Sequence, residues 1–198
     1  MQAGAELRSL YEGDELVMVP GAPDALTARL VEQAGFPAVY MTGFAATATL
    51  IGRPDIGLLT QTEMTTHARN IVRAVDIPVI ADADTGYGGP ASIERTVEEY
   101  CQAGVAAIHL EDQVQPKRCG HMAGVKLVPA GDMVRRLTCA LEARDTRDML
   151  IIGRTDACAT SGVDEAIERG RCYLDAGVDI LFVDAVKHVS DAVALGQA

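Results

Sequence analysis

The stretch Ile77-Pro-Val-Ile-Ala-Asp-Ala-Asp-Thr-Gly-Tyr-Gly-Gly89 decides the fold class, because a short apolar run passes directly into acidic residues and glycines. Comparable apolar runs recur along the chain, each followed by a turn and then by a longer segment with helical spacing. This order is typical of parallel βαβ units, and the lack of strict alternation predicts strands buried on both faces. The six expected strands are residues 16–19, 38–42, 77–81, 105–110, 149–153 and 179–183.

Helices are expected between the strands, and polar residues follow the ends of five strands. In a doubly wound sheet chemistry gathers chiefly at the two strands beside the switch point, whereas a barrel draws on many strands. The distribution therefore favours an α/β fold of the (β/α)8 barrel type. A complete barrel needs eight units and usually ~250 residues, so we expect residues 1–198 to form one barrel domain that lacks its C-terminal units. The expected helices are residues 23–34, 62–75, 91–103, 130–143 and 163–176.

Composition excludes several classes of protein. The chain has 17 Lys and Arg against 28 Asp and Glu, a net charge of −11, which argues against nucleic acid or an anionic membrane as partner. No apolar stretch approaches the roughly 20 residues that span a bilayer, and the amino terminus does not resemble a signal peptide. Five widely spaced cysteines without a Cys-x-x-Cys pair fit neither a disulfide framework nor a zinc site. We therefore expect a cytoplasmic protein with free thiols.

Asp82 and Asp84, directly after the third expected strand, are the strongest candidates for metal ligands. One residue separates them, so both carboxylates can point the same way and offer the hard oxygen ligands that Mg²⁺ or Mn²⁺ prefers. Glu111, at the end of the next strand, adds a third carboxylate, and three such groups repel one another unless a cation or protons intervene. The alternative interpretation is a solvated acidic turn.

The same segment also fits a dinucleotide-binding fingerprint, through Gly86-x-Gly88-x-x-Ala91 and Glu111 about 20 residues later. Two aspartates immediately before the glycines would face the pyrophosphate, and the fingerprint begins too late relative to the strand. A nicotinamide-dependent oxidoreductase is therefore the alternative from another class of enzyme.

Residues 111–121 begin a loop of about 18 polar or irregular residues, and loops of this length are often active-site lids. Within it, Cys119 is flanked by Lys117, Arg118 and His121. Nearby cations lower the pKa of a thiol, which makes a thiolate or a proton donor available near neutral pH. The alternative is a basic surface loop with an incidental cysteine.

Arg154, after the fifth expected strand, has a planar guanidinium group that suits a substrate carboxylate. His109 lies inside an expected strand, and we expect a buried histidine there whose ring nitrogens have hydrogen-bond partners in the core. No function is expected for His67 or His188. The other four cysteines are expected to be small apolar residues on helices or beside strand ends.

Several motifs together resemble the isocitrate lyase/phosphoenolpyruvate mutase superfamily. The sequence Lys-Arg-Cys-Gly-His at residues 117–121 is most similar to the 2-methylisocitrate lyase branch and to related lyases of substituted malates. The resemblance extends from about Met18 to the end of the chain. It implies a (β/α)8 barrel, dependence on Mg²⁺ or Mn²⁺, and cleavage of a carbon–carbon bond through an enolate to a 2-oxo acid. The motifs are residues 19–22, 54–57, 82–88, 111–113, 117–121 and 154–157.

The resemblance also implies a role for each candidate site residue. Cys119 would protonate the enolate carbon, with Lys117 and His121 beside it. Tyr40 would help to remove a hydroxyl proton, and Arg154 would bind a substrate oxygen. The implied metal site comprises Asp82 and Asp84, with Asp55 and Glu111 in its outer shell. The implied substrate-binding residues are Thr42, Gly43, Phe44 and Gly120.

Three departures from the family pattern bear on these expectations. Thr42-Gly43-Phe44 stands where the lyases usually have Ser-Gly, Asp184 stands where a Glu is common, and the last two βα units with the exchanged terminal helix are missing.

The leading hypothesis is a Mg²⁺-dependent lyase of 2-methylisocitrate or a substituted malate, a homo-oligomer that is tetrameric in the full-length family. The alternatives are an oxaloacetate decarboxylase of the same superfamily and an inactive binding fragment.

Overall fold

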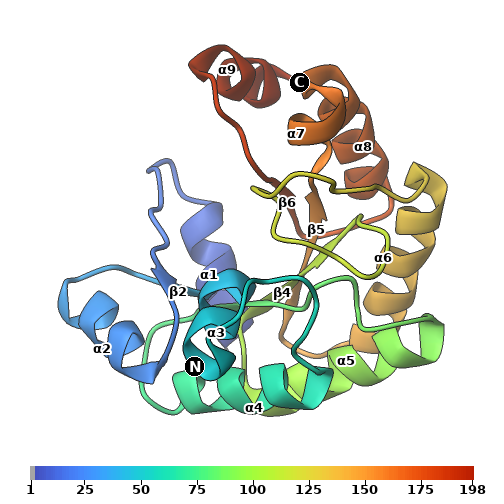
Figure 1. Ribbon diagram of the computed structural model, residues 1–198. Helices are drawn as coiled ribbons and strands as arrows, with labels where there is room; N and C mark the ends of the chain where they lie inside the picture. Colours follow the sequence, from blue (N-terminus) through green and yellow to red (C-terminus); the bar gives the residue numbers. More distant parts are fainter. Residues whose placement is uncertain (1–2) are drawn as a thin grey trace.

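Six parallel strands form one sheet, in which each strand pairs with the next strand along the chain (Figure 1). The computed structural model describes residues 3–198. The order β1-β2-β3-β4-β5-β6 confirms the barrel type of α/β fold, because a doubly wound sheet reverses its order at the switch point. The strands are β1 (Gly21–Ala22), β2 (Val39–Met41), β3 (Val79–Asp82), β4 (Ala107–Glu111), β5 (Leu150–Thr155) and β6 (Ile180–Val183). The helices are α1 (Ala3–Tyr11), α2 (Ala25–Gln33), α3 (Gly43–Ile51), α4 (Gln61–Val72), α5 (Pro90–Ala103), α6 (Ala130–Arg144), α7 (Ala157–Ser161), α8 (Val163–Asp175) and α9 (Val189–Gln197).

The first strand is not where the sequence predicts it. Residues 16–19 form no strand, and β1 lies after them and pairs only with β2, over two residue pairs. Leu16 and Met18 are 93% and 63% exposed, and of this apolar run only Val19 packs against a hydrophobic cluster. β1 is an edge strand, and of the residues before it Pro20 accepts a hydrogen bond from the Tyr40 N–H of β2, at 2.9 Å, whereas residues 16–19 form no ladder with a neighbouring strand. The other five strands lie within two residues of their expected ranges.

The five expected helices form as α2, α4, α5, α6 and α8, while α1, α3, α7 and α9 are not expected from the sequence. The sequence of α3, Gly-Phe-Ala-Ala-Thr-Ala-Thr-Leu-Ile, consists mostly of small and β-branched residues and has no polar face opposite an apolar stripe, so the periodicity gives no helical signal. This helix begins at Gly43 and therefore positions the residues expected in the substrate-binding loop. No helix among residues 3–198 is long and apolar enough to cross a membrane.

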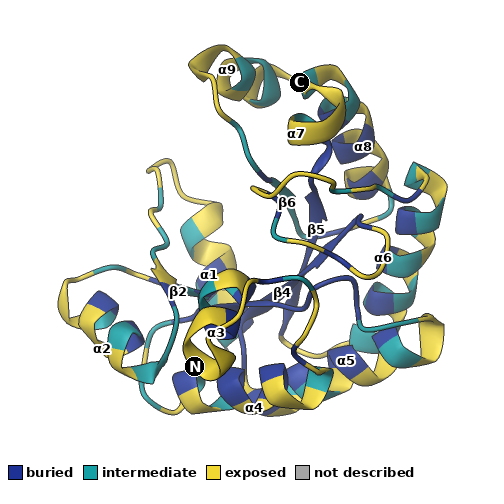
Figure 2. Ribbon diagram, in the orientation of Figure 1, coloured by how far each residue is buried: buried dark blue, intermediate teal, exposed yellow. Residues whose placement is uncertain are grey.

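Apolar side chains pack on both faces of the sheet. Val39 and Met41 belong to the larger cluster, which the outer helices cover, whereas Ile80 and Ile152 belong to a smaller cluster on the opposite face. Figure 2 shows buried residues along the central strands and on the sheet-facing sides of the helices. Strands β3, β4 and β5 are buried along their whole length, as expected, but β6 is only half-buried. β6 is the second edge of the sheet, so it lacks a neighbour on one side.

The glycine-rich turn after β3 packs against α5. A Cβ atom at Gly86 would lie 2.6 Å from Ile93 Cγ1, and one at Gly88 would lie 2.6 Å from Ser92 Oγ. Both glycines also have positive φ angles, which side chains disfavour. The close approach that these glycines permit is to the helix, which accounts for the apparent dinucleotide fingerprint without a nucleotide.

Candidate active site

The carboxyl ends of strands β2 to β6 and the long loop after β4 enclose a pocket of about 510 Å³. Several different strands contribute to it, as expected for a barrel. All the site residues expected from the sequence line it except Gly43 and Asp84. The Gly43 N–H donates to Asp82 Oδ2 at 3.1 Å, and Asp84 reaches the pocket wall through Lys117. The lining residues are Tyr40, Thr42, Phe44, Asp55, Asp82, Glu111, Lys117, Arg118, Cys119, Gly120, His121, Met122, Arg154, Phe182 and Asp184.

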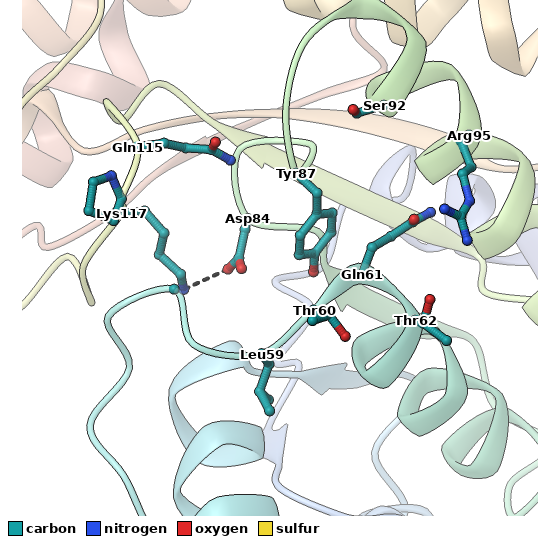
Figure 3. Close-up of a pocket in the computed structure, with 12 residues that line it drawn as sticks. Leu59, Thr60, Gln61, Thr62, Asp84, Tyr87, Ser92, Arg95, Gln115 and Lys117 are labelled. Carbon is teal, nitrogen blue, oxygen red and sulfur yellow. Dashed lines mark ion pairs between the residues drawn. The ribbon is translucent and has the colours of Figure 1, made fainter.

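Lys117 is buried between two carboxylates. Its Nζ lies 2.7 Å from Asp55 Oδ2 and 2.6 Å from Asp84 Oδ1, and Figure 3 shows the second of these ion pairs. Burial by itself would lower the pKa of Lys117, but the surrounding carboxylates, led by Asp82 and Asp84, hold it above its ordinary value. The lysine therefore remains an ammonium ion whose charge is neutralised inside the site.

Cys119 does not have the lowered pKa that the sequence suggests. Burial raises the pKa of its thiol, and the neighbouring Lys117 charge is already held by Asp55 and Asp84. The Cys119 Sγ lies 4.0 Å from His121 Nδ1, and its backbone N–H donates to the Asp55 carbonyl at 2.9 Å. At neutral pH the residue is thus a protonated thiol, which suits a proton donor better than a nucleophile.

Asp82 and Asp84 are held in different protonation environments. Burial raises the pKa of Asp84 to about 7, and the Asp82 charge adds to this effect. Burial acts in the same direction on Asp82, but His109, Lys117 and Arg154 together bring the pKa of Asp82 below its ordinary value. The Asp84 N–H also donates to Asp82 Oδ1 at 2.9 Å. Near neutral pH Asp82 is therefore ionised, whereas Asp84 is divided between its protonated and its ionised form.

The donor groups fit a hydrated divalent cation. Glu111 Oε1 is buried and accepts no hydrogen bond from the described part of the chain, and burial raises the pKa of Glu111 well above its ordinary value. Asp84 Oδ1 is also buried, and the Lys117 ammonium group lies 2.6 Å from it. Within residues 3–198, no group of three His, Cys, Asp or Glu side chains is arranged as a complete metal cage. Mg²⁺ commonly keeps several waters and uses one or two carboxylates, so the site has the oxygen chemistry that such an ion needs.

Arg154 is oriented by two aspartates at the floor of the pocket. Its Nη2 contacts Asp156 Oδ1 at 2.8 Å and Asp184 Oδ2 at 2.7 Å. Its Nε lies 3.4 Å from Glu111 Oε2, and the guanidinium group lies 5.4 Å from the centre of the Phe182 ring. Burial would lower the pKa of Arg154, but these carboxylates hold it above its ordinary value. Arg154 lines the pocket together with the other candidate residues, and the sequence did not predict that Asp156 and Phe182 would lie against it.

The lid loop rests directly on this cluster. Gly120 is buried, and a Cβ atom there would collide with Asp184 Oδ2 and Asp156 Oδ1. Gln113 fixes the same loop from behind, because its Nε2 donates to the Arg118 carbonyl at 2.8 Å and its Oε1 accepts from the Arg118 N–H at 2.9 Å. In the structure the loop therefore lies over Arg154 in a closed position.

A buried hydrogen-bond network fixes the ends of β4 and β5. Asp112 is fully buried, and its Oδ1 accepts from the Asp156 N–H at 3.0 Å. Its Oδ2 accepts from Thr155 Oγ1 at 2.7 Å and from the hydroxyl of Tyr173 at 2.8 Å. Sequence reasoning missed this role for Asp112, because the partners lie more than 40 positions away along the chain.

The buried His109 pairs with the half-buried Tyr40, which lines the pocket. His109 Nε2 lies 2.7 Å from the Tyr40 hydroxyl and 3.6 Å from Asp82 Oδ1. The expectation of a fully satisfied core histidine is only half met, since His109 Nδ1 has no hydrogen-bond partner within residues 3–198. Burial lowers the pKa of His109 to about 4 and raises the pKa of Tyr40 well above its ordinary value. Both side chains are therefore neutral near pH 7.

This neutral histidine predicts a loss of stability in acid. The pKa of His109 is lower in the folded chain, about 4, than the ordinary value of about 6.5 in the unfolded chain, so unfolding takes up a proton. The stability present above pH 6.5 is then lost as the pH falls toward 4. Between pH 7.5 and 4.5 the free energy of unfolding should fall by roughly 2.5 kcal/mol more in the wild type than in His109→Gln. Urea unfolding of both proteins measures this difference, and equal pH dependence would contradict it.

A second pocket, of about 620 Å³, lies on the other side of the Lys117–Asp84 pair (Figure 3). The starts of α4 and α5 contribute Thr60, Gln61 and Ser92 to its wall. Lys117 lines both pockets, whereas Asp84 lines only the second one. The lysine side chain thus forms part of the wall between the two.

The sequence profile described as Phosphoenolpyruvate phosphomutase matches residues 7–197. The chain is 50% identical to 2,3-dimethylmalate lyase of Eubacterium barkeri over 185 residues, which are 93% of this chain and 64% of that relative. It is 46% identical to a probable 2-methylisocitrate lyase of Corynebacterium glutamicum over 185 residues, 93% of this chain and 60% of that relative. The chain thus spans less than two thirds of the length of these relatives.

Solved structures agree with these sequence comparisons. A crystal structure of 2,3-dimethylmalate lyase, described as a PEP mutase/isocitrate lyase superfamily member, superposes with a TM-score of 0.94 and 42% sequence identity. The match covers 100% of this chain and 67% of that chain. The profile match, the identities and the structural superposition together show that the chain belongs to the phosphoenolpyruvate phosphomutase family, within the PEP mutase/isocitrate lyase superfamily.

Proposed function

We propose that this chain carries the active site of a Mg²⁺-dependent carbon–carbon lyase that cleaves a substituted malate, of the 2,3-dimethylmalate or 2-methylisocitrate type, to a 2-oxo acid. The observation that carries the proposal is that a single pocket is lined by the carboxylates of Asp55, Asp82 and Glu111, by the Arg154 guanidinium group and by the Cys119 thiol of the lid. Relatives named as lyases of these two substrates support it.

The reaction requires removal of a hydroxyl proton, breakage of the carbon–carbon bond, and protonation of the carbon that keeps the electron pair. The hydroxyl becomes the carbonyl of the 2-oxo acid, and the other fragment leaves as an enolate that needs a proton on carbon. Cys119 is placed to donate this proton, because its thiol is protonated and lines the same pocket as Arg154. Arg154, fixed by Asp156 and Asp184, binds a substrate carboxylate or oxygen.

Tyr40 is the candidate for accepting the hydroxyl proton. Since burial raises the pKa of its phenol, it accepts a proton only while passing its own to His109 Nε2, 2.7 Å away. Asp82 and Asp84, with Asp55 and Glu111 around them, would hold a Mg²⁺ ion whose charge stabilises the developing oxyanion. Mn²⁺ suits the same oxygen donors.

Release of 2-oxo acid by the purified 198-residue chain tests the proposal. The substrates are 2,3-dimethylmalate, 2-methylisocitrate, isocitrate and oxaloacetate, each with Mg²⁺ and with a chelator. We expect one substituted malate to be preferred and the chelator to abolish its cleavage. Preference for oxaloacetate would favour the decarboxylase alternative. No release of 2-oxo acid by the folded chain would contradict the proposal for this chain.

Replacing one acidic ligand should weaken the cation site without a change of shape. Asp84→Asn keeps the size of the side chain but removes a charge and a hard donor, so we expect Mn²⁺ affinity to fall about ten-fold or more. Titration of Mn²⁺ followed by the EPR signal of the free ion measures this change. Asp132→Asn, at the exposed start of α6, is the control and should leave the affinity unchanged. Equal affinities for wild type and Asp84→Asn would remove Asp84 from the site.

We also propose a cytoplasmic homo-oligomer, tetrameric in the full-length family, as the family resemblance implies. Exposed apolar side chains on α2 and α3, among them Leu26 and Leu30 at 70% and 56% exposure, support an association surface. Sedimentation of the purified chain tests it, and a monomer at micromolar concentration would contradict self-association of this chain.

A further inference from the structure

We propose that Arg169, on α8, is a positioning residue for substrate binding. It acts through Asp112 on the backbone of Asp156, and Asp156 in turn orients the Arg154 guanidinium group. Arg169 is not among the residues that line either of the two pockets, so its effect on the substrate must pass through these residues. The inference deepens the proposed function and rests on it, in that it requires Arg154 to bind a substrate carboxylate or oxygen.

The guanidinium group of Arg169 is buried where α8 packs against β5 (Figure 1). Its Nη1 lies 3.1 Å from Asp112 Oδ2 and donates to the Val128 carbonyl at 2.9 Å. Its Nε donates to Glu165 Oε1, one turn earlier on the same helix, at 2.7 Å. Because different nitrogens of one planar group bind the two carboxylates, Glu165 fixes the orientation in which Arg169 meets Asp112.

Asp112 needs the charge that Arg169 supplies. Asp112 is fully buried, and within residues 3–198 Arg169 is the one cationic side chain that forms an ion pair with it. Three other donors, two hydroxyls and a backbone N–H, also contact its oxygens, but none of them carries a charge. A buried carboxylate is costly unless it is both hydrogen-bonded and paired with a cation. Arg169 therefore keeps the ionised carboxylate of Asp112 in this place.

Asp156 connects Asp112 to the substrate-binding cation. Its backbone N–H donates to Asp112 Oδ1 at 3.0 Å, and its side-chain Oδ1 accepts from Arg154 Nη2 at 2.8 Å. Asp112 thus holds the backbone of the same residue whose side chain holds Arg154. A shift of Asp112 moves the Asp156 backbone, and with it the carboxylate that orients Arg154 toward the pocket.

Steady-state kinetics of Arg169→Gln with the preferred substituted malate test the inference. Glutamine supplies no charge, so Asp112 and Asp156 should lose their fixed positions, and we expect KM to rise about ten-fold. Weaker binding of a carboxylate that takes no part in bond breakage raises KM without lowering kcat, so kcat should stay within about three-fold of wild type. Mn²⁺ affinity should stay within about two-fold, because Arg169 contacts none of the proposed cation ligands.

Two further variants are the controls for this measurement. Arg169→Lys restores the positive charge and should return KM to within about three-fold of the wild-type value. Arg171→Gln is the matched control, because it removes an exposed arginine from the same helix, and it should change neither KM nor kcat. The lid loop keeps its own anchor in all these variants, since the Val128 N–H donates to the Asp112 carbonyl at 2.8 Å.

A double-mutant cycle distinguishes action through Asp156 from a general loss of packing. Asp156→Asn should itself raise KM, since it alters one of the two aspartates that orient Arg154. Once Asp156 no longer holds Arg154 firmly, adding Arg169→Gln should raise KM by less than about two-fold further. If the two substitutions acted independently, their effects on KM would multiply.

A merely structural role for Arg169 predicts a different result. Loss of folded enzyme lowers the apparent kcat at an unchanged KM, and this outcome overturns the inference. Independent effects in the cycle, or a KM in Arg169→Lys as high as in Arg169→Gln, also overturn it. If circular dichroism shows that Arg169→Gln does not fold, Tyr173→Phe takes its place. This variant removes the 2.8 Å hydrogen bond to Asp112 Oδ2 and keeps every charge.

The expected rise of KM in Tyr173→Phe is about three-fold, and an unchanged KM overturns the inference. The same assays separate the inference from the proposed function. If the wild type releases no 2-oxo acid from any of the substrates, the proposed function fails, and the inference fails with it. If the wild type is active but Arg169→Gln leaves KM unchanged, only the inference is overturned.

Discussion

Cys119→Ser is expected to lower turnover of the preferred substituted malate about 10³-fold while leaving Mn²⁺ affinity within about two-fold of wild type. Serine is nearly the same size as cysteine, so the lid should close as before. A serine hydroxyl is a far weaker acid than a thiol, and it cannot deliver a proton to carbon at a useful rate. The hydrogen bond from the Cys119 backbone N–H to the Asp55 carbonyl, at 2.9 Å, is retained, and the carboxylates proposed to hold the cation are unchanged.

Initial rates of 2-oxo acid release and the Mn²⁺ titration together measure the two halves of this expectation. Cys172→Ser, an exposed free cysteine on α8, is the matched control and should keep full activity. Equal losses of turnover and of metal affinity would mean that Cys119 holds the site together rather than donating a proton. Full activity of Cys119→Ser would assign the proton to another group.

The barrel could be predicted because its signal is repeated. Five of the six strands follow from short apolar runs that end in polar residues, and the residues at those ends do meet in one pocket. The failures are at the places where local sequence does not decide the outcome. Residues 16–19 resemble a strand but lack a neighbour to pair with, and α3 contains the small and β-branched residues of a strand or loop but forms a helix.

The sequence predicts which residues come together in the pocket, but it does not predict their charge states. Lys117 and Cys119 are two positions apart in the sequence, so a lowered thiol pKa was the natural inference from the residues alone. In the fold, Asp55 and Asp84 bind the lysine, and burial then raises the pKa of the thiol. Which charges neutralise one another depends on residues that are far apart in the chain, and no local pattern records this.

Gly120→Ala is expected to lower turnover about 10²-fold without a large change in the melting temperature. Gly120 does not have a left-handed backbone conformation, so alanine is not strained there by its φ angle. The cost arises only when the lid closes, because the new Cβ atom would collide with Asp184 Oδ2 and Asp156 Oδ1, the two oxygens that hold Arg154. A displaced lid leaves Cys119 too far from the enolate carbon, and a misplacement of about 1 Å is enough to cost this much.

The same collision distinguishes a lid defect from a folding defect. A lid that cannot close leaves Cys119 more exposed, so its alkylation by iodoacetamide should become faster in Gly120→Ala, while kcat falls. Gly131→Ala, in the first turn of α6, is the matched control, since a Cβ atom there meets only Arg135 Nη1 at 3.9 Å, and it should change neither rate. If Gly120→Ala were as active as wild type, the closed position of the lid on Asp156 and Asp184 could not be the catalytic one. Proton donation by Cys119 would then have to occur from a loop conformation that stands further from Arg154.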